Sequence, residues 1–384
     1  MKILKLYNQI KHYEWGSVNL IPDFIGVENK DKRPCAEMWM GTHSLSPSHV
    51  QSGGKMISLA QAAGRELPFL FKLLAVEKPL SIQAHPNKAQ AREGFLRENM
   101  AGIPIDAYER NYKDTNHKPE IICAITPFTM MAGFREAENI RLSLKAFMSA
   151  APQLKEIIAV LLRAFDSGSI AVFFNALFNL SKSEKEYASD FIIENKIRET
   201  EDLSSEQLQL MKKFALQYHA DAAILSPLYL NVITIQRGQA VFIPAGILHA
   251  YIYGFGVELM SSSDNVLRGG LTPKHIDIEE LMKVLKFSAF IPQVLSPDSD
   301  FFRYPSPCDD FSLILLRGGK NTLPTNSGAI CIVTEGELNA ADETFKKGES
   351  FYVCGGEDIV FSGNYSLFVA STAQEAGAVG AQTT

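Results

Sequence analysis

The sequence has few cysteines: Cys35, Cys123, Cys308, Cys331 and Cys354 are the only five among 384 residues. Their number is odd, they are widely spaced, and no two of them form a CxxC pair. Disulfide-stabilised secreted domains and thiolate zinc sites use paired, closely spaced cysteines. We therefore expect reduced thiols and a cytoplasmic protein.

Long apolar runs and basic runs are also absent. No stretch approaches the roughly 18 apolar residues of a spanning helix, and the N-terminus lacks the apolar region of a signal peptide. The formal net charge is -6, without a Lys/Arg run that could follow a phosphate backbone. We therefore expect neither a membrane nor a nucleic-acid partner. The 46% hydrophobic content is enough for a large core, and the length predicts two or three domains at about 150 residues each.

Three polar residues alternate along the segment that follows the apolar run 68–76. In an extended strand, Ser81, Gln83 and His85 lie on one face, because side chains two positions apart point the same way. Such groups cost desolvation energy unless something binds them, which points to a metal and a polar ligand. Pro86 ends the strand, and a helix is expected over 87–99.

A second polar pair opens the apolar segment 121–125. Lys118 and Glu120 share a face, and Pro119 keeps its predecessor extended. A simple salt bridge is the alternative interpretation of this pair. Further upstream lie Trp15 and the Glu37–Trp39 alternation, for which core packing with surface carboxylates is an equally good interpretation.

The spacing Gly238-x5-Pro244-x-Gly246-x2-His249 matches a signature of the cupin jelly-roll family: a glycine turn, a strand, and a corner that presents a histidine. The C-terminal segment repeats the corner around Gly348 and Gly355, with Ile359 in the place of His249. We therefore expect a mainly β protein with an α insertion, built from two jelly-roll barrels, the second without a metal ligand. The expected parts are a catalytic jelly roll in residues 1–136 and 223–285, an inserted helical domain in 137–222, and a degenerate jelly roll in 286–384.

Gln83, His85, Glu120 and His249 together form a candidate metal centre. Two imidazoles, a carboxylate and an amide oxygen, without a thiolate, suit zinc and also manganese, iron or cobalt. The other histidines that stand alone are interpreted as ordinary core or surface residues: His12, His43, His49, His219 and His275.

Cationic side chains accompany this centre, and they predict an anionic small substrate. Arg268, in a glycine-rich loop, can form a bidentate fork to phosphate or to an enediolate oxygen. Lys72, Lys118 and Lys274 add charge, and the alternative is that they are scattered surface lysines.

Several long motifs resemble the type I mannose-6-phosphate isomerases. The resemblance is carried by residues 81–86, 117–120, 244–249 and 263–274, together with 15–17 and 36–41, and it extends over residues 1 to about 285. It implies a zinc-dependent isomerase, with one zinc per chain, that interconverts mannose 6-phosphate and fructose 6-phosphate through a cis-enediolate.

The resemblance also assigns roles to residues. Its metal ligands fall on Gln83, His85, Glu120 and His249, and its active-site arginine falls on Arg268. Lys72 resembles a phosphate-binding lysine. The remaining expected active-site residues are Ser81, Lys118, Tyr251, Glu258, Asp264 and Lys274, with Trp15 and Glu37 as further substrate contacts.

The sequence leaves the general base open among Glu258, Asp264, His85 and Lys118, and His117 or Arg268 could assist ring opening. We expect a monomer. Two other classes compete with the isomerase: a cupin that binds a sugar phosphate without turnover, and a metal oxygenase. The oxygenase usually needs an HxH pair, and here Gln83 takes the first position.

Overall fold

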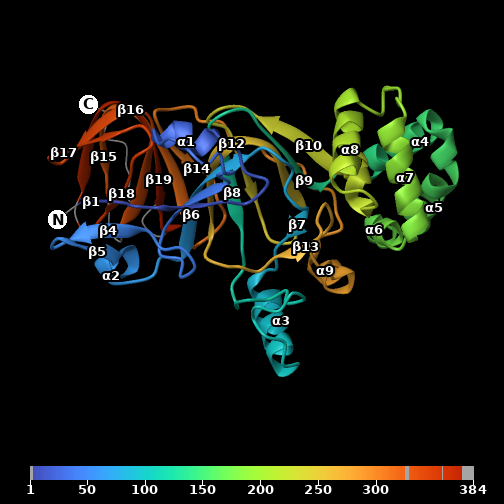
Figure 1. The fold of residues 1–384 in the computed structure, drawn as a ribbon, viewed down its shortest axis with the longest axis horizontal. Coiled ribbons are helices and arrows are strands. Elements are labelled where there is room, and N and C mark those ends of the chain that lie inside the picture. Colours follow the sequence, from blue (N-terminus) through green and yellow to red (C-terminus); the bar gives the residue numbers. More distant parts are fainter. Residues whose placement is uncertain (1–2, 325–327, 357, 374–384) are drawn as a thin grey trace.

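The computed structural model describes residues 3–324, 328–356 and 358–373. Within these ranges strands predominate, in two large sheets and one two-stranded sheet, and a group of helices lies at one end (Figure 1). No helix of the described residues is both long and apolar enough to cross a membrane.

The larger sheet is organised around β12, which pairs with β6, β7, β8 and β9. Its order is β10-β9-β12-β6-β3-β2, with β11 on β8 and β13 on β7. The apolar run of β6 is buried along its whole length, including Lys72. The strands of this sheet are β2 (Gln9–Lys11), β3 (Glu37–Met40), β6 (Phe69–Val76), β7 (Gln83–Ala84), β8 (Glu120–Ala124), β9 (Phe128–Phe134), β10 (Leu230–Ile235), β11 (Ala240–Ile243), β12 (His249–Ser261) and β13 (Leu267–Arg268).

The second sheet has the order β1-β18-β16-β19-β15-β14, with β17 on β16. Its strands are β1 (Ile3–Lys5), β14 (Phe301–Tyr304), β15 (Ser312–Leu323), β16 (Ala329–Ala340), β17 (Glu343–Lys346), β18 (Ser350–Val353) and β19 (Ile359–Ser371). The pairing of β1 with β18 places β1 in this sheet. From the sequence alone we expect residues 1–136, and so β1, in the catalytic jelly roll. The two sheets share a core in which Phe71 and Phe255 belong to the same cluster as Tyr304 and Phe368.

Helices follow β9, and aromatic packing fixes them to the first sheet. Phe134 at the end of β9 contacts Phe174 and Tyr229, with ring centroids 5.7 and 6.2 Å apart. Ser181 and Ser204 begin two of the helices with capping boxes. The elements of this group are α4 (Ala137–Ala150), η1 (Pro152–Leu154), α5 (Lys155–Ser167), α6 (Ile170–Phe178), α7 (Lys182–Glu194), α8 (Ser205–Gln217) and η2 (Ala222–Leu228).

The helix expected over 87–99 is α3 (Lys88–Met100), which begins at an Asn87 capping box and projects away from the sheets (Figure 1). The remaining elements are α1 (Leu20–Ile25), α2 (Leu59–Ala63), α9 (Ile278–Val284), β4 (His49–Ser52) and β5 (Lys55–Ser58).

The glycine corner before β12 determines where His249 lies. Gly246 has φ +82°, and a Cβ there would lie 2.9 Å from the carbonyl oxygen of Val284, so only glycine fits. His249 is then the first residue of β12, as Ile359 is the first residue of β19.

Candidate metal centre and active site

Three buried side chains converge from separate strands of the larger sheet. His249 opens β12, Glu120 opens β8, and His85 directly follows β7. The Nε2 of His249 lies 2.7 Å from Oε1 of Glu120, and the Nε2 of His85 lies 3.6 Å from Oε2. All three donor atoms lie within 4.8 Å of one another, which is compatible with ligation of a common ion.

The backbone sets the orientation of both imidazoles. The Nδ1 of His85 lies 2.7 Å from the carbonyl oxygen of Asn265, and that of His249 lies 3.0 Å from the carbonyl oxygen of Ile247. Since a carbonyl only accepts, each Nδ1 carries a proton, and in the neutral form of each ring the lone pair of Nε2 points toward Glu120. Burial, followed by the charge of Lys118, holds the pKa of His85 well below its usual range.

The carboxylate between these imidazoles is incompletely satisfied. Among the described residues, the buried Oε2 of Glu120 has no hydrogen-bond partner. The nearest cation, the Nζ of Lys118, lies 3.6 Å away. A buried carboxylate with an imidazole beside each of its oxygens is a costly arrangement without a cation. The residues therefore fit a divalent metal, and the donor set of nitrogen and oxygen fits zinc.

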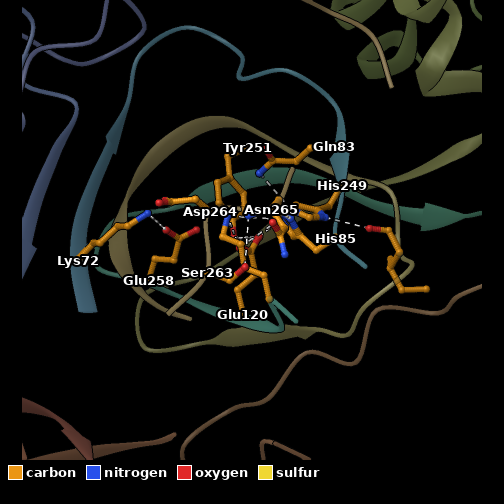
Figure 2. Close-up of polar contacts among 12 residues, drawn as sticks. Lys72, Gln83, His85, Glu120, His249, Tyr251, Glu258, Ser263, Asp264 and Asn265 are labelled. Carbon is orange, nitrogen blue, oxygen red and sulfur yellow. Dashed lines mark hydrogen bonds and ion pairs between the residues drawn. The ribbon is translucent and has the colours of Figure 1, made fainter. Parts of the chain in front are cut away.

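Gln83 completes the group from the neighbouring strand (Figure 2). It is the register partner of His249, and its Nε2 lies 3.4 Å from the Nε2 of His249. A half-turn of the carboxamide exchanges nitrogen and oxygen, which would place the amide oxygen toward the metal centre. Tyr251 donates from its hydroxyl to Oε1 of Glu120 at 3.2 Å, so it helps to fix the carboxylate.

A cavity of about 1530 Å³ opens beside this centre. Helical residues from Phe178 to Ala222 form part of its wall, so the insertion borders the site. The expected site residues that line the cavity are Trp15, Glu37, Lys72, Ser81, Gln83, Asp264, Arg268 and Lys274. The other expected residues, apart from His117, lie behind this surface at the metal centre or in the ion pairs described next.

Lys72 is held by two carboxylates. Its Nζ lies 3.0 Å from Oε2 of Glu258 and 3.7 Å from Oε1 of Glu37 (Figure 2 shows the first pair). Burial alone would lower the pKa of Lys72, but Glu258 and then Glu37 raise it above its usual range, so it is a cation. Two carboxylates neutralise this charge, which argues against the expectation that Lys72 binds phosphate.

Glu37 is a buried residue rather than a surface carboxylate. It is 8% exposed, and Trp39 donates its indole N–H to Oε2 of Glu37 at 2.5 Å. Core packing explains Trp39, but the accompanying surface carboxylate was a wrong interpretation.

Positively charged side chains lie at a different part of the cavity, around Arg268. Arg268 is the register partner of Gln83, and its buried Nε has no hydrogen-bond partner among the described residues. Burial lowers the pKa of Lys274, and the charges of Arg268 and Lys113 lower it further. Arg268, Lys274 and Lys113 are therefore three neighbouring cations that line the cavity. Lys113 was missed because it belongs to no motif.

His43 was also missed, because it stands alone in the sequence and such histidines are usually ordinary core or surface residues. Its Nε2 lies 3.4 Å from Oδ2 of Asp264, and its Nδ1 accepts from the N–H of Leu45 at 3.3 Å. Burial would raise the pKa of Asp264, but the hydrogen bond and charge of His43, followed by Lys118 and Lys113, lower it on balance.

His117 does not join the site. Its Nε2 lies 2.8 Å from Oδ2 of Asp310, and it is not among the residues that line the cavity. The expectation that it assists ring opening is therefore wrong for this arrangement. Alternation along the strand could not reveal this, since His117 precedes β8 and its partner lies almost two hundred residues away.

Comparisons with known proteins agree with this geometry. A family model for the catalytic domain of type I phosphomannose isomerase matches residues 3–137. The mannose-6-phosphate isomerase of Escherichia coli (strain K12) is 38% identical over 93% of this chain and 96% of its own. Mannose-6-phosphate isomerase 2 of Arabidopsis thaliana is 31% identical over 88% and 84%.

Solved structures are similar over almost the whole chain. A mannose 6-phosphate isomerase from Salmonella typhimurium bound to fructose 6-phosphate and zinc has a TM-score of 0.86 and 35% identity, covering 97% of this chain and all of its own. A zinc-bound mannose 6-phosphate isomerase gives the same score and coverage.

Proposed function

The chain belongs to the type I phosphomannose isomerase family, and we propose that it interconverts mannose 6-phosphate and fructose 6-phosphate with one zinc ion in its active site. The observation that carries this proposal is the incompletely satisfied Glu120 carboxylate between His85 and His249, beside a cavity lined by the cationic side chains of Arg268, Lys274 and Lys113. A metal-assisted sugar-phosphate isomerase needs zinc ligands and, in the same cavity, cations that bind the phosphate group of the substrate.

We assign the zinc to Gln83, His85, Glu120 and His249. A bound zinc ion supplies a Lewis acid that stabilises negative charge developing on a sugar oxygen. Tyr251 orients the Glu120 carboxylate, and the carbonyls of Asn265 and Ile247 hold the two imidazoles in the ligating tautomer.

The substrate phosphate is assigned to Arg268, Lys274 and Lys113. The guanidinium of Arg268 has an unused buried N–H, and a phosphate there would relieve repulsion among the three cations. Ser81 lines the same cavity and can donate its hydroxyl. Because Arg268 is one strand from Gln83, it can also reach a sugar oxygen near the metal centre.

Asp264 is the general base that the geometry favours. Its side chain lines the cavity and is 36% exposed, so a carboxylate oxygen can approach the substrate. Glu258 is 5% exposed and engaged by Lys72, although burial raises its pKa toward a more suitable value. His85 is assigned as a ligand, and Lys118 lies against Glu120 and His85. Position comes before pKa in choosing a base, so Asp264 is assigned to move the proton between the two carbons of the cis-enediolate.

The fold supports a finer assignment as well. Both large sheets would be cupin-type jelly rolls, interrupted in the first case by the helices of residues 137–222. The second would lack a metal site because Ile359 occupies the position of His249 at the start of its long strand. The monomeric state and the cytoplasmic location stay predictions.

A coupled assay with mannose 6-phosphate, with and without a chelator, tests the function. We expect turnover that the chelator abolishes and zinc restores, and a zinc-loaded protein without turnover would overturn the proposal. His249→Ala should lose both active-site zinc and activity.

Exchange of the substrate's C2 proton with solvent tests the base. Asp264→Asn should abolish exchange, whereas Glu258→Gln should retain part of it. If Glu258→Gln abolished the exchange and Asp264→Asn retained part of it, the base would be Glu258.

A further inference from the structure

A second group of metal-binding side chains lies outside the cavity. His117 precedes β8, while Cys308 and Asp310 lie in the connection between β14 and β15. One donor atom of each residue lies within 4.8 Å of the other two, and the Nε2 of His117 lies 2.8 Å from Oδ2 of Asp310. The proposed function uses none of these three contacts.

The group is partly enclosed but accessible. The side chains of His117 and Asp310 are 22% and 13% exposed, and Cys308 is buried as a free thiol. An ion could therefore enter from solvent and still lose most of its hydration shell. The hydroxyl of Ser261, 3.7 Å from the Sγ of Cys308, and the Nζ of Lys88, 3.7 Å from Oδ1 of Asp310, surround the three donors.

The same structure offers an internal comparison. At the assigned zinc site an imidazole nitrogen and a carboxylate oxygen lie 2.7 Å apart, and in the second group the corresponding distance is 2.8 Å. A metal-free ion pair is the alternative. The contacts with Asp310 and Cys308 raise the pKa of His117 to about 9, and the pKa of Asp310 is lowered to about 2.

A third donor of a different kind distinguishes the group from a simple ion pair. A histidine and an aspartate are sufficient for an ion pair, and the thiol of Cys308, which also contacts His117, adds a sulfur donor to them. Nitrogen, sulfur and oxygen donors with an open fourth position for water are a set that zinc and cobalt accept.

We propose that His117, Cys308 and Asp310 form a second divalent-metal site that takes zinc or cobalt. On binding, Cys308 loses its thiol proton and His117 its additional proton to solvent, and the thiolate and carboxylate then balance the two charges of the ion. The site joins the segment leading into β8 to the connection between β14 and β15. It therefore ties the two large sheets together where Cys308 and Phe311 enter their shared core.

Cobalt substitution tests this proposal without interference from the active site. A thiolate bound to cobalt gives a charge-transfer band in the near ultraviolet, and the assigned active-site ligands include no thiolate. Full-length protein titrated with cobalt should develop this band. His249→Ala should retain it, while Cys308→Ser should lose it and Cys354→Ser, a half-buried cysteine elsewhere, should not.

Zinc content provides the second measurement. Wild type should hold one more equivalent of zinc per chain than either Cys308→Ser or Asp310→Asn. Two substitutions at different ligands guard against a folding defect in one of them, and the wild-type titration needs no variant at all. Absence of the band in cobalt-loaded wild type, with the same zinc content in all three proteins, would leave only an ion pair and overturn the proposal.

Discussion

The Nε2 of His43 lies 3.4 Å from Oδ2 of Asp264, where the carboxylate faces the cavity. The N–H of Leu45 donates to the Nδ1 of His43, so the neutral ring carries its proton on Nε2 and donates it to Asp264. The rings of His43 and Trp39 also pack nearly perpendicular to each other, with centroids 5.0 Å apart. His43 is therefore positioned to orient the proposed base.

Removal of this contact should move the acid limb of the pH profile. Burial raises the pKa of Asp264 and His43 lowers it, so His43→Leu leaves the burial effect less opposed and the pKa rises. Because the base must be ionised, kcat/KM should then fall at a higher pH than in wild type. His43→Gln keeps a donor and should shift less. If the pH profile of kcat/KM were unchanged in His43→Leu while Asp264→Asn was inactive, His43 would contribute only packing and would not tune Asp264.

Tyr251→Phe should weaken zinc binding by about 10- to 100-fold, the usual effect of removing a partner that orients a ligand. The variant removes only the hydroxyl that donates to Glu120. Competition with a chelator measures the affinity. Tyr304→Phe is the control, because Tyr304 is equally buried but donates to the carbonyl oxygen of Gly238, away from the metal centre. Equal zinc affinity in both variants would contradict the orienting role.

The sequence predicted which residues converge at the metal centre, but it predicted less well which residues contact one another elsewhere. Alternation along short strands brought out Gln83, His85 and Glu120, and the glycine corner brought out His249, because both patterns depend on local backbone geometry. The β1–β18 pairing joins residues 3–5 to residues 351–353, and no local pattern encodes it. No local pattern indicates the pairs of Lys72 with Glu258 and Glu37 either.

Loop contacts account for most of the remaining differences. Nothing near His43 or His117 in the sequence indicates Asp264 or Asp310 as partners, since the direction of a loop side chain follows from tertiary packing. A motif therefore identified His117 as an active-site residue although its side chain turns to the other sheet.

Arg268→Met should raise KM for mannose 6-phosphate by about 10- to 100-fold, the equivalent of about 1.5–3 kcal/mol for hydrogen bonds to a charged group. Since the Nε of Arg268 has no partner among the described residues, the variant should unfold at nearly the wild-type temperature. Steady-state kinetics and thermal unfolding measure the two effects. Lys185→Met is the control, because Lys185 also lines the cavity but donates to the carbonyl oxygen of Phe178 at 2.8 Å. A similar KM in both variants would place the phosphate elsewhere.

Lys72→Met should lower the free energy of unfolding by about 3–5 kcal/mol at neutral pH, because it leaves buried carboxylates without their cation. In the variant, loss of the Lys72 charge would raise the pKa of Glu258 further above its value in the unfolded state. The deficit is therefore largest above the raised pKa of the folded state, shrinks as the pH falls and the carboxylate takes up a proton, and is gone below the pKa of the unfolded state. Urea unfolding at neutral and mildly acidic pH measures this change. Lys346→Met, which removes an exposed pair with Glu337 at 3.6 Å, should cost at most about 1 kcal/mol. If Lys72→Met costs no more than this control at neutral pH, the buried pair does not stabilise the fold in this way.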